Sequence, residues 1–281
     1  MPTYDTPGPV SATIDVVAGD VRISASDRAD TVVDVRPSDA SNADDVKAAR
    51  MTHVHHAKDH VVVKAPRSRS WLPRGGAGSI EITIELPAGS HVYGTAHTAD
   101  FHCDGPLGTC RIKTGTGAVR LDRAATVSVK SATGDVSVEH ATGPAAVATA
   151  TGDVRLGAVD GSAVIKSSIG DTWVGTAGGD LSASTAKGSI AVDHARASIV
   201  AKSAYGDLRV GEAGRGSVAL QTHAGDVEVG VPAGTAAYLD VRATGGRVRN
   251  ELEGADGPEP AAETVEVRAR TSAGDIVIRR A

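Results

Sequence analysis

A short turn element recurs at a nearly constant interval through the middle of the chain, and this repeat constrains the fold more than any other feature. Its consecutive glycines are separated by steps of 17, 18, 18, 18, 18 and 19 residues. The seven glycines are Gly117, Gly134, Gly152, Gly170, Gly188, Gly206 and Gly225. Self-similarity at a short fixed period indicates a solenoid, in which each repeat buries its apolar side against its neighbours.

Apolar residues alternate on both sides of each turn glycine. In the repeat of Gly152, Val154 and Leu156 follow the glycine, while Ala145 and Val147 precede it. Every second side chain of a strand points to the same face, so each repeat contains two strands with an inward apolar face. A hydroxyl residue always stands three positions before the glycine: Thr114, Ser131, Thr149, Ser167, Thr185, Ser203 and Thr222. We expect these hydroxyls to stack in an inward column and to hydrogen-bond along it.

These patterns predict an all-β fold, a single-stranded parallel β-solenoid (β-helix) of about ten short coils. A looser copy of the turn at Ala99-Asp100-Phe101 precedes the seven, and two further copies follow at Gly246 and Gly274 after insertions. Each coil adds a parallel strand at a spacing of ~4.8 Å. Glycine supplies the positive φ of a sharp corner, and the following Asp is expected to hydrogen-bond the next amides as an Asx turn.

The first 90 residues follow a different pattern. Alternating apolar residues in 13–17, 31–35 and 80–86 predict strands, and residues 44–50 predict a short helix. An open solenoid end exposes unpaired strand edges, which such a segment can cover. We therefore predict an N-terminal β-rich cap at 1–90 and a solenoid domain at 91–281, with a surface loop at 251–264.

The composition limits the size of the core and the class of function. The chain has 1 Phe, 4 Tyr and 2 Trp in 281 residues, so small aliphatic side chains must fill the interior. A formal net charge of -5 lacks the basic excess of a dedicated nucleic-acid binder. Two cysteines make no disulfide framework, and Cys103 and Cys110 are expected as core thiols on facing strands. With no export signal and no membrane-spanning stretch in the sequence, we expect a cytoplasmic location.

Neither carboxylates nor histidines predict a metal site, and no cofactor is expected. The corner aspartates supply a single carboxylate per coil and are interrupted by Ser189, whereas calcium takes six to eight oxygens. His53, His55, His56 and His60 form the densest histidine group without a convincing set of further ligands. A solvated strand face is the preferred interpretation of the histidines.

Basic residues recur on both outer strand faces. One set stands four residues before the turn glycine (Lys113, Lys130, Lys166 and Lys202), and the other stands three after it (Arg120, Arg155 and Arg209). Such stripes suit an anionic polymer or the headgroups of a membrane surface. Charge on exposed strands is equally ordinary protection of a soluble face.

The two tryptophans lie outside the repeat rule. Trp173 is exposed by strand parity, and such a ring can anchor a partner. The segment 67–76 places Trp71 beside Arg67, Arg69 and Arg74 in a glycine-rich loop. Either this loop contacts a protein or a membrane surface, or its Trp folds back on the cap.

Several stretches carry a resemblance to a known family. They are the Thr-Gly-Asp-Val elements, Asp171-Thr172-Trp173-Val174-Gly175, Gly246-Arg247-Val248-Arg249-Asn250-Glu251-Leu252 and Pro87-Ala88-Gly89-Ser90. The chain resembles the bacterial β-strand-repeat family, which is catalogued as a domain of unknown function and labelled "putative adhesin". The resemblance covers almost the full length and implies a β-solenoid with no established catalytic residues.

Three functions compete on this basis. The first is a non-catalytic scaffold or protein-interaction module, with an unknown partner or self-association. The second is a binder of an anionic polymer or membrane surface through the basic stripes. The third is a carbohydrate-active enzyme, which ranks last because paired carboxylates and aromatic sugar platforms are missing from the pattern. We therefore expect no enzymatic activity.

Overall fold

The structure is a computed structural model that describes residues 2–66, 78–252 and 263–281. Its contacts divide the chain into two compact units, Met1–Val138 and Glu139–Ala281. The described residues form strands almost throughout and a single helix. The prediction of an all-β parallel solenoid is confirmed, and the two units are described separately below.

Unit 1 holds the helix and the first strands. Its elements are β1 (Thr3–Asp5), β2 (Ser11–Ser26), β3 (Asp30–Pro37), α1 (Ala43–Met51), β4 (His53–Ala57), β5 (His60–Lys64), β6 (Ser79–Pro87), β7 (His91–Thr116) and β8 (Val119–Thr133). Strand β9 (Val136–Ala141) crosses the boundary between the units.

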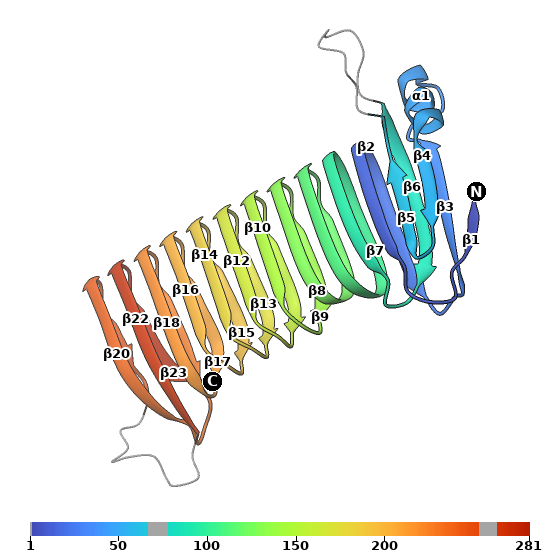
Figure 1. Ribbon diagram of the computed structural model, residues 1–281. Coiled ribbons are helices and arrows are strands. Elements are labelled where there is room, and N and C mark those ends of the chain that lie inside the picture. Colours follow the sequence, from blue (N-terminus) through green and yellow to red (C-terminus); the bar gives the residue numbers. More distant parts are fainter. Residues whose placement is uncertain (1, 67–77, 253–262) are drawn as a thin grey trace. The chain divides into compact units, whose positions relative to one another are not determined.

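Unit 2 consists of short strands that follow one another in a regular succession (Figure 1). They are β10 (Ala145–Thr151), β11 (Val154–Val159), β12 (Ala163–Ile169), β13 (Thr172–Ala177), β14 (Leu181–Lys187), β15 (Ile190–Ala195), β16 (Ile199–Tyr205), β17 (Leu208–Ala213), β18 (Gly216–Ala224), β19 (Val227–Val231), β20 (Ala236–Gly245), β21 (Val248–Asn250), β22 (Thr264–Ala273) and β23 (Ile276–Arg280).

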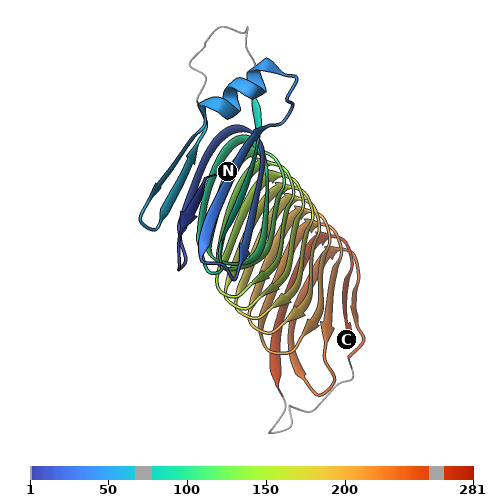
Figure 2. The same cartoon turned by 90° about the vertical axis from the view of Figure 1, so that its right-hand side faces the viewer.

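Each coil of unit 2 carries one strand on each of two sides, and Figure 2 shows the coils as flattened loops. From β10 to β18 the even-numbered strands pair in parallel on one side, and from β11 to β19 the odd-numbered strands pair on the other. Ala163 lies opposite Leu181, and Thr172 lies opposite Ile190, which is one repeat further along the chain. The predicted repeat is therefore the coil itself.

The inward columns form the core of unit 2. Val154 and Leu156 have no exposed surface, and Ile165 is 1% exposed. A coil of two short strands encloses a narrow slot, and columns of Val, Ile, Leu and Ala fill it. This confirms the predicted inward positions and explains why aromatic rings are scarce.

The inward hydroxyl column is buried except for the partly exposed Ser167, and Ser203 and Thr222 bond differently from the prediction. Ser203 Oγ donates to the carbonyl oxygen of Gly188 at 3.0 Å, and Thr222 Oγ1 donates to that of Gly206 at 2.9 Å. Each acceptor is the corner glycine of the preceding coil. The predicted bonding from hydroxyl to hydroxyl is wrong for these residues because a backbone carbonyl lies within reach and needs a donor.

The corner aspartates link successive coils. The amide of Asp171 donates to Asp153 Oδ1 at 2.9 Å, and the amide of Ser189 donates to Asp171 Oδ1 at 2.8 Å. Ser189 Oγ accepts from the amide of Asp207 at 3.3 Å in the same way. The expected Asx turn within one corner is thus replaced by an aspartate ladder, in which each side chain accepts from the next coil.

The corner glycines are required by both conformation and space. Gly188 has a φ of 145°, and a Cβ placed on it would lie 2.0 Å from the carbonyl oxygen of Gly170 in the neighbouring coil. A larger residue would therefore strain the corner and separate the coils.

The last two coils of unit 2 stand in reverse chain order. Strand β22 pairs with β18 on one side and with β20 on the other, so that Val267 lies between Val218 and Leu239 (Figure 1). Likewise β23 pairs with both β19 and β21. The C-terminal coil, which contains Gly274, therefore lies between the coil of Gly225 and the coil of Gly246. The coil of Gly246 is the outer one.

The aspartate ladder explains this order. The amide of Asp275 donates to Asp226 Oδ1, and the amide of Arg247 donates to Asp275 Oδ1, both at 2.8 Å. Arg247 occupies the ladder position of the outer coil and has no carboxylate to offer to a further amide. The coil of Gly246 can therefore end the ladder but cannot continue it.

Unit 1 is built around the long strand β2. It pairs in parallel with β5 and β6 on one side and with β7 on the other, so that Val21 lies between Ile82 and Phe101. Strand β3 pairs antiparallel with β6, and β1 with β3. The first 90 residues thus contain β2, which pairs in parallel on both edges like a solenoid strand, as well as the antiparallel strands β1 and β3. The boundary predicted at residue 90 stays a prediction.

Helix α1 confirms the short helix predicted in this region. The Asn42 side chain accepts from the amide of Asp44 at its N-terminus. Asp45 is buried and accepts from the amides of Asp39 and Ser79, which ties the helix to the start of β6.

Candidate functional site

Trp173 is the predicted contact residue that the structure describes in most detail. It lies on the outer face of β13, between Arg155 on β11 and Ala191 on β15, and is 39% exposed. Its indole Nε1 donates to Asp193 Oδ2 at 3.1 Å. A Cβ built on Gly175 would lie 3.2 Å from the ring, so the indole rests against that glycine. The ring is therefore both exposed and held in place.

Along the register the ring has Arg155 on one side and Ala191 on the other. We call the group of Arg155, Trp173, Gly175, Asp193 and Arg209 the Trp173 shelf. Ala191 separates the tryptophan from Arg209 along the register. Ala191 and Gly175 carry little or no side chain, the ring stays partly exposed, and the two arginines supply positive charge on either side of it.

The arginine stripe on this side is interrupted within unit 2. Arg209 lies opposite Glu228, and their charged atoms are 3.8 Å apart. Arg279 Nε also donates to Glu228, at 2.6 Å. The shelf therefore carries a local positive rim instead of one end of a continuous basic stripe.

The lysine stripe on the other side of unit 2 is longer than predicted. Lys166 and Lys202 are exposed and lie in one register row with Ser184 and Gln221. The row then continues to Arg270 on β22 and Arg242 on β20. Arg270 comes next to Gln221 only because β22 is interposed, which sequence periodicity did not indicate. Its guanidinium lies 3.4 Å from Asp240 Oδ2.

The remaining stripe residues belong to unit 1. Lys113 and Lys130 are exposed and lie opposite each other on β7 and β8. Arg120 is also exposed, and its Nη1 lies 3.1 Å from His102 Nε2. Trp71, Arg67, Arg69 and Arg74 lie outside the described residues, as does most of the loop predicted at 251–264, so these hypotheses stay predictions.

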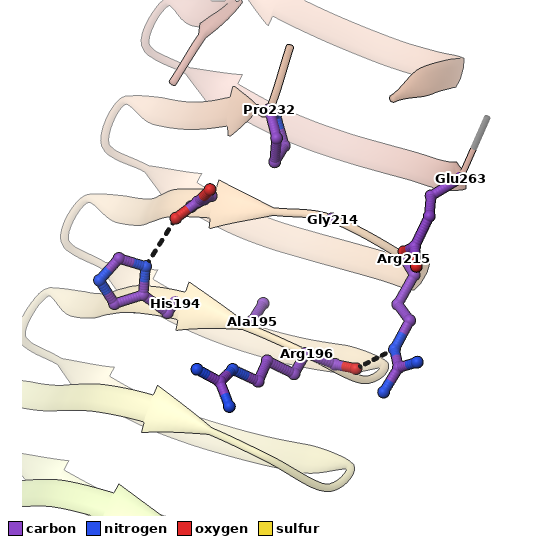
Figure 3. Close-up of a pocket in the computed structure, with 8 residues that line it drawn as sticks. His194, Ala195, Arg196, Gly214, Arg215, Pro232 and Glu263 are labelled. Carbon is purple, nitrogen blue, oxygen red and sulfur yellow. Dashed lines mark hydrogen bonds and ion pairs between the residues drawn. The ribbon is translucent and has the colours of Figure 1, made fainter. Parts of the chain in front are cut away.

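A surface hollow of about 450 Å³ lies in unit 2 beside the corners that follow β15, β17 and β19, on the side of the coils away from the turn glycines (Figure 3). His194 Nδ1 and Glu212 Oε2 are 2.7 Å apart at one side of it. At the other, Arg215 Nε donates to the carbonyl oxygen of Arg196 at 2.7 Å. Pro232 and Glu263 complete the lining. Sequence analysis missed this hollow because the corners that follow the odd-numbered strands share no constant residue.

The hollow offers polar contacts to a ligand and little more. Its imidazole is already engaged with a carboxylate, and its lining residues include no Ser, Thr or Cys among those described. A nucleophile beside a base, which covalent catalysis needs, is therefore not assembled there.

Three of the four grouped histidines of unit 1 are exposed on strands, as predicted, whereas His56 is half-buried on the opposite face of β4. His53, His55 and His60 are exposed, and the ring of His56 stacks on Tyr4 with centroids 4.6 Å apart. Within residues 2–66, 78–252 and 263–281, no three His, Cys, Asp or Glu side chains gather as a metal site.

The register and the inward columns define the class of this protein as a parallel β-solenoid. The chain belongs to the family described as Toastrack DUF4097, whose model matches residues 11–279. No curated protein matches it. In the described part of the chain, no helix is long and apolar enough to cross a membrane.

Several solved structures are similar to this chain over almost its full length. A "putative adhesin" from Bacteroides fragilis shares 14% identity over 99% of this chain and 95% of its own, with a TM-score of 0.40. Another from Parabacteroides distasonis shares 14% identity over 98% and 95%, with a TM-score of 0.37. A third, from Parabacteroides merdae, shares 12% over 98% and 94%, with a TM-score of 0.36.

Proposed function

We propose that this protein is a non-catalytic interaction module that presents the Trp173 shelf to a protein partner. The observation that carries the proposal is the exposed indole fixed to Asp193. A ring that is already immobilised loses little conformational entropy on binding, and Trp is enriched at the centres of protein interfaces. The cost of exposing it to water is recovered when a partner covers it.

The charges around the ring indicate the kind of partner. Arg155 and Arg209 flank Trp173 along the register, and both are exposed. Asp193 uses one carboxylate oxygen for the indole. We therefore expect a partner with an apolar contact at the ring and acidic groups beside it. The identity of the partner, self-association and the cytoplasmic location stay predictions.

The test compares Trp173→Ala with a matched control in pull-downs from a lysate of the native host, analysed by mass spectrometry. Val164→Ala is the control, since Val164 is 42% exposed on β12, which belongs to the other side of the coils. A protein captured by wild type and by Val164→Ala, and reduced at least tenfold by Trp173→Ala, supports the proposal. Equal capture by all three, with equal melting temperatures, contradicts it.

A second candidate function rests on the lengthened lysine stripe. Lys166, Lys202, Arg270 and Arg242 share one row and would contact an anionic polymer or a layer of anionic headgroups. Such binding falls steeply with salt, whereas an anchor centred on Trp173 should not. Co-sedimentation with anionic vesicles, and retention on polyphosphate, would be lost in Lys202→Glu/Arg242→Glu and kept in Arg215→Glu. Retention that is equal in all three contradicts this function.

A further inference from the structure

The two cysteines of the 281-residue chain lie in the core of unit 1, in the same strand β7. Cys110 has no exposed surface, and Cys103 is 2% exposed. This confirms the prediction that both are core thiols. Their shared position in one coil is a second feature, which burial alone does not explain.

The chain turns between the two cysteines. Gly105 has a φ of 80°, and the pairing of β7 with β8 shifts its register between Cys103 and Pro106. On either side of this corner, Cys103 lies opposite Leu121 and Cys110 lies opposite Val127. The two thiols therefore point into the same slot from the two sides of one coil, next to a corner.

Contact with the Cys110 thiol, together with burial, raises the pKa of Cys103 well above its ordinary value. Facing sheets lie ~10 Å apart, which is too far for a disulfide unless both cysteines lie near a corner. The corner at Gly105 meets that condition.

Equivalent positions in other coils carry apolar pairs. In unit 2 they are Leu156 with Ala163 and Val210 with Val218, and all four side chains are buried. A pair of cysteines replaces such a pair in one coil, and it uses every cysteine in the sequence. A disulfide in this place leaves no polar group unsatisfied, because both sulfurs become part of the apolar core.

We propose that Cys103 and Cys110 are a disulfide-forming site that closes the corner of β7. A low-molecular-weight disulfide such as oxidised glutathione is the oxidant. The thiolate of one cysteine attacks a glutathione sulfur and displaces one glutathione thiolate, which forms a mixed disulfide. The second cysteine, as thiolate, attacks the protein sulfur of that mixed disulfide and displaces the other glutathione. The protein loses two protons and two electrons, and two molecules of reduced glutathione are released.

Burial determines when this exchange occurs. Only the thiolate attacks a disulfide, and a thiol with a raised pKa inside the core is mainly protonated and shielded. The bond therefore forms while the chain folds or while this coil is open. Once formed, it is shielded from reductants by the same packing.

The test begins with reduced wild-type protein unfolded in guanidinium chloride. It is refolded with mixed oxidised and reduced glutathione, and then alkylated under denaturing conditions. We expect a monomer lighter by two hydrogens, without alkylation, with Cys103 and Cys110 joining the two peptides that cleavage before Asp104 produces. Two alkylated thiols per chain, glutathione adducts or disulfide-linked dimers as the main product would overturn the proposal.

A stability measurement separates the bond from ordinary packing. The oxidised wild type should melt at a higher temperature than the same protein after it has been unfolded, reduced with dithiothreitol and refolded in its presence. Cys103→Ala/Cys110→Ala, which keeps the corner but cannot form the bond, should show no shift with dithiothreitol. An equal shift in this variant would assign the effect to the reductant and contradict a stabilising bond.

Discussion

Strand β2 of unit 1 and strand β20 of unit 2 are both out of chain order, yet they are protected very differently. Strand β2 has parallel partners on both edges, and Val21 and Ile23 are at most 1% exposed. Strand β20 pairs with β22, and in the described chain its other edge has no strand partner. Its inward residues Leu239 and Val241 are only half-buried.

The difference shows that the two units protect their strand edges from further pairing by different means. In unit 1, antiparallel β3 and helix α1 cover the strands next to β2. In unit 2, the outer coil lacks the groups that would join a further coil: Ala243 replaces the hydroxyl residue, and Arg247 replaces the ladder aspartate. Charged residues on an edge also discourage pairing with another chain. In unit 1 other elements cover the strands, whereas in unit 2 the outer coil lacks the groups that would bond a further coil.

The largest effect is expected from a charge in the narrow core of unit 2. Ile165→Asp should cost about 4 kcal/mol or more, because it buries an unpaired carboxylate. Val248→Asp, at a position 43% exposed in the outer coil, should be tolerated. Soluble expression and thermal melting of both variants provide the check. A normally melting Ile165→Asp protein would show that the core register is wrong.

A milder pair of truncations compares the two strands directly. Ile23→Ala should destabilise by about 2–4 kcal/mol, since it leaves a cavity between two fully packed neighbours. Leu239→Ala should cost clearly less, because its side chain is already half-exposed to water. Denaturant unfolding measures both values, and equal losses would mean that β20 is as well covered as β2.

The aspartate ladder should give a smaller effect. Asp207→Ala removes the acceptor of the amide of Asp226 and should cost about 1 kcal/mol. Arg247→Ala, at the terminated position, should change stability very little. Chemical denaturation of the two variants separates them, and a larger loss for Arg247→Ala would argue against termination at this residue.

The smallest effect is a pH dependence of the outer coil. The donated amide of Arg247, with the Arg247 and Arg249 guanidiniums, lowers the pKa of Asp275 below its ordinary value. Since the folded pKa is the lower one, this charge stabilises the fold above the unfolded value of about 3.9 and ceases to do so as the pH falls through the folded value. Asp275→Asn, which keeps an acceptor oxygen, should melt lower than wild type at pH 7, and the difference should shrink as the pH falls through the folded pKa of Asp275. A constant difference would contradict this assignment.

Periodicity predicted the coil, its inward columns and its glycine corners, because each is repeated in every coil. It did not predict the order of the last two coils. Gly246 and Gly274 both follow insertions, so the repeat does not determine which of their coils is the outer one. Arg247 marks the end of the aspartate ladder only because the aspartates bond between coils, which the sequence did not predict.

The site was predicted in part for a similar reason. Strand parity predicted that Trp173 is exposed, but its bond to Asp193 depends on the direction of the indole across two strands. The hollow at His194 and Arg215 lies at the corners that follow the odd-numbered strands, and no residue repeated at these corners predicts it.

Amide hydrogen exchange tests the interposition of β22 most directly, since this order underlies the lengthened basic row and the terminated outer coil. We predict that amides of 265–271 exchange as slowly as those of β18, while amides of 237–243 exchange much faster. Faster exchange in 265–271 than in 237–243 would place β22 at the outside and contradict the account.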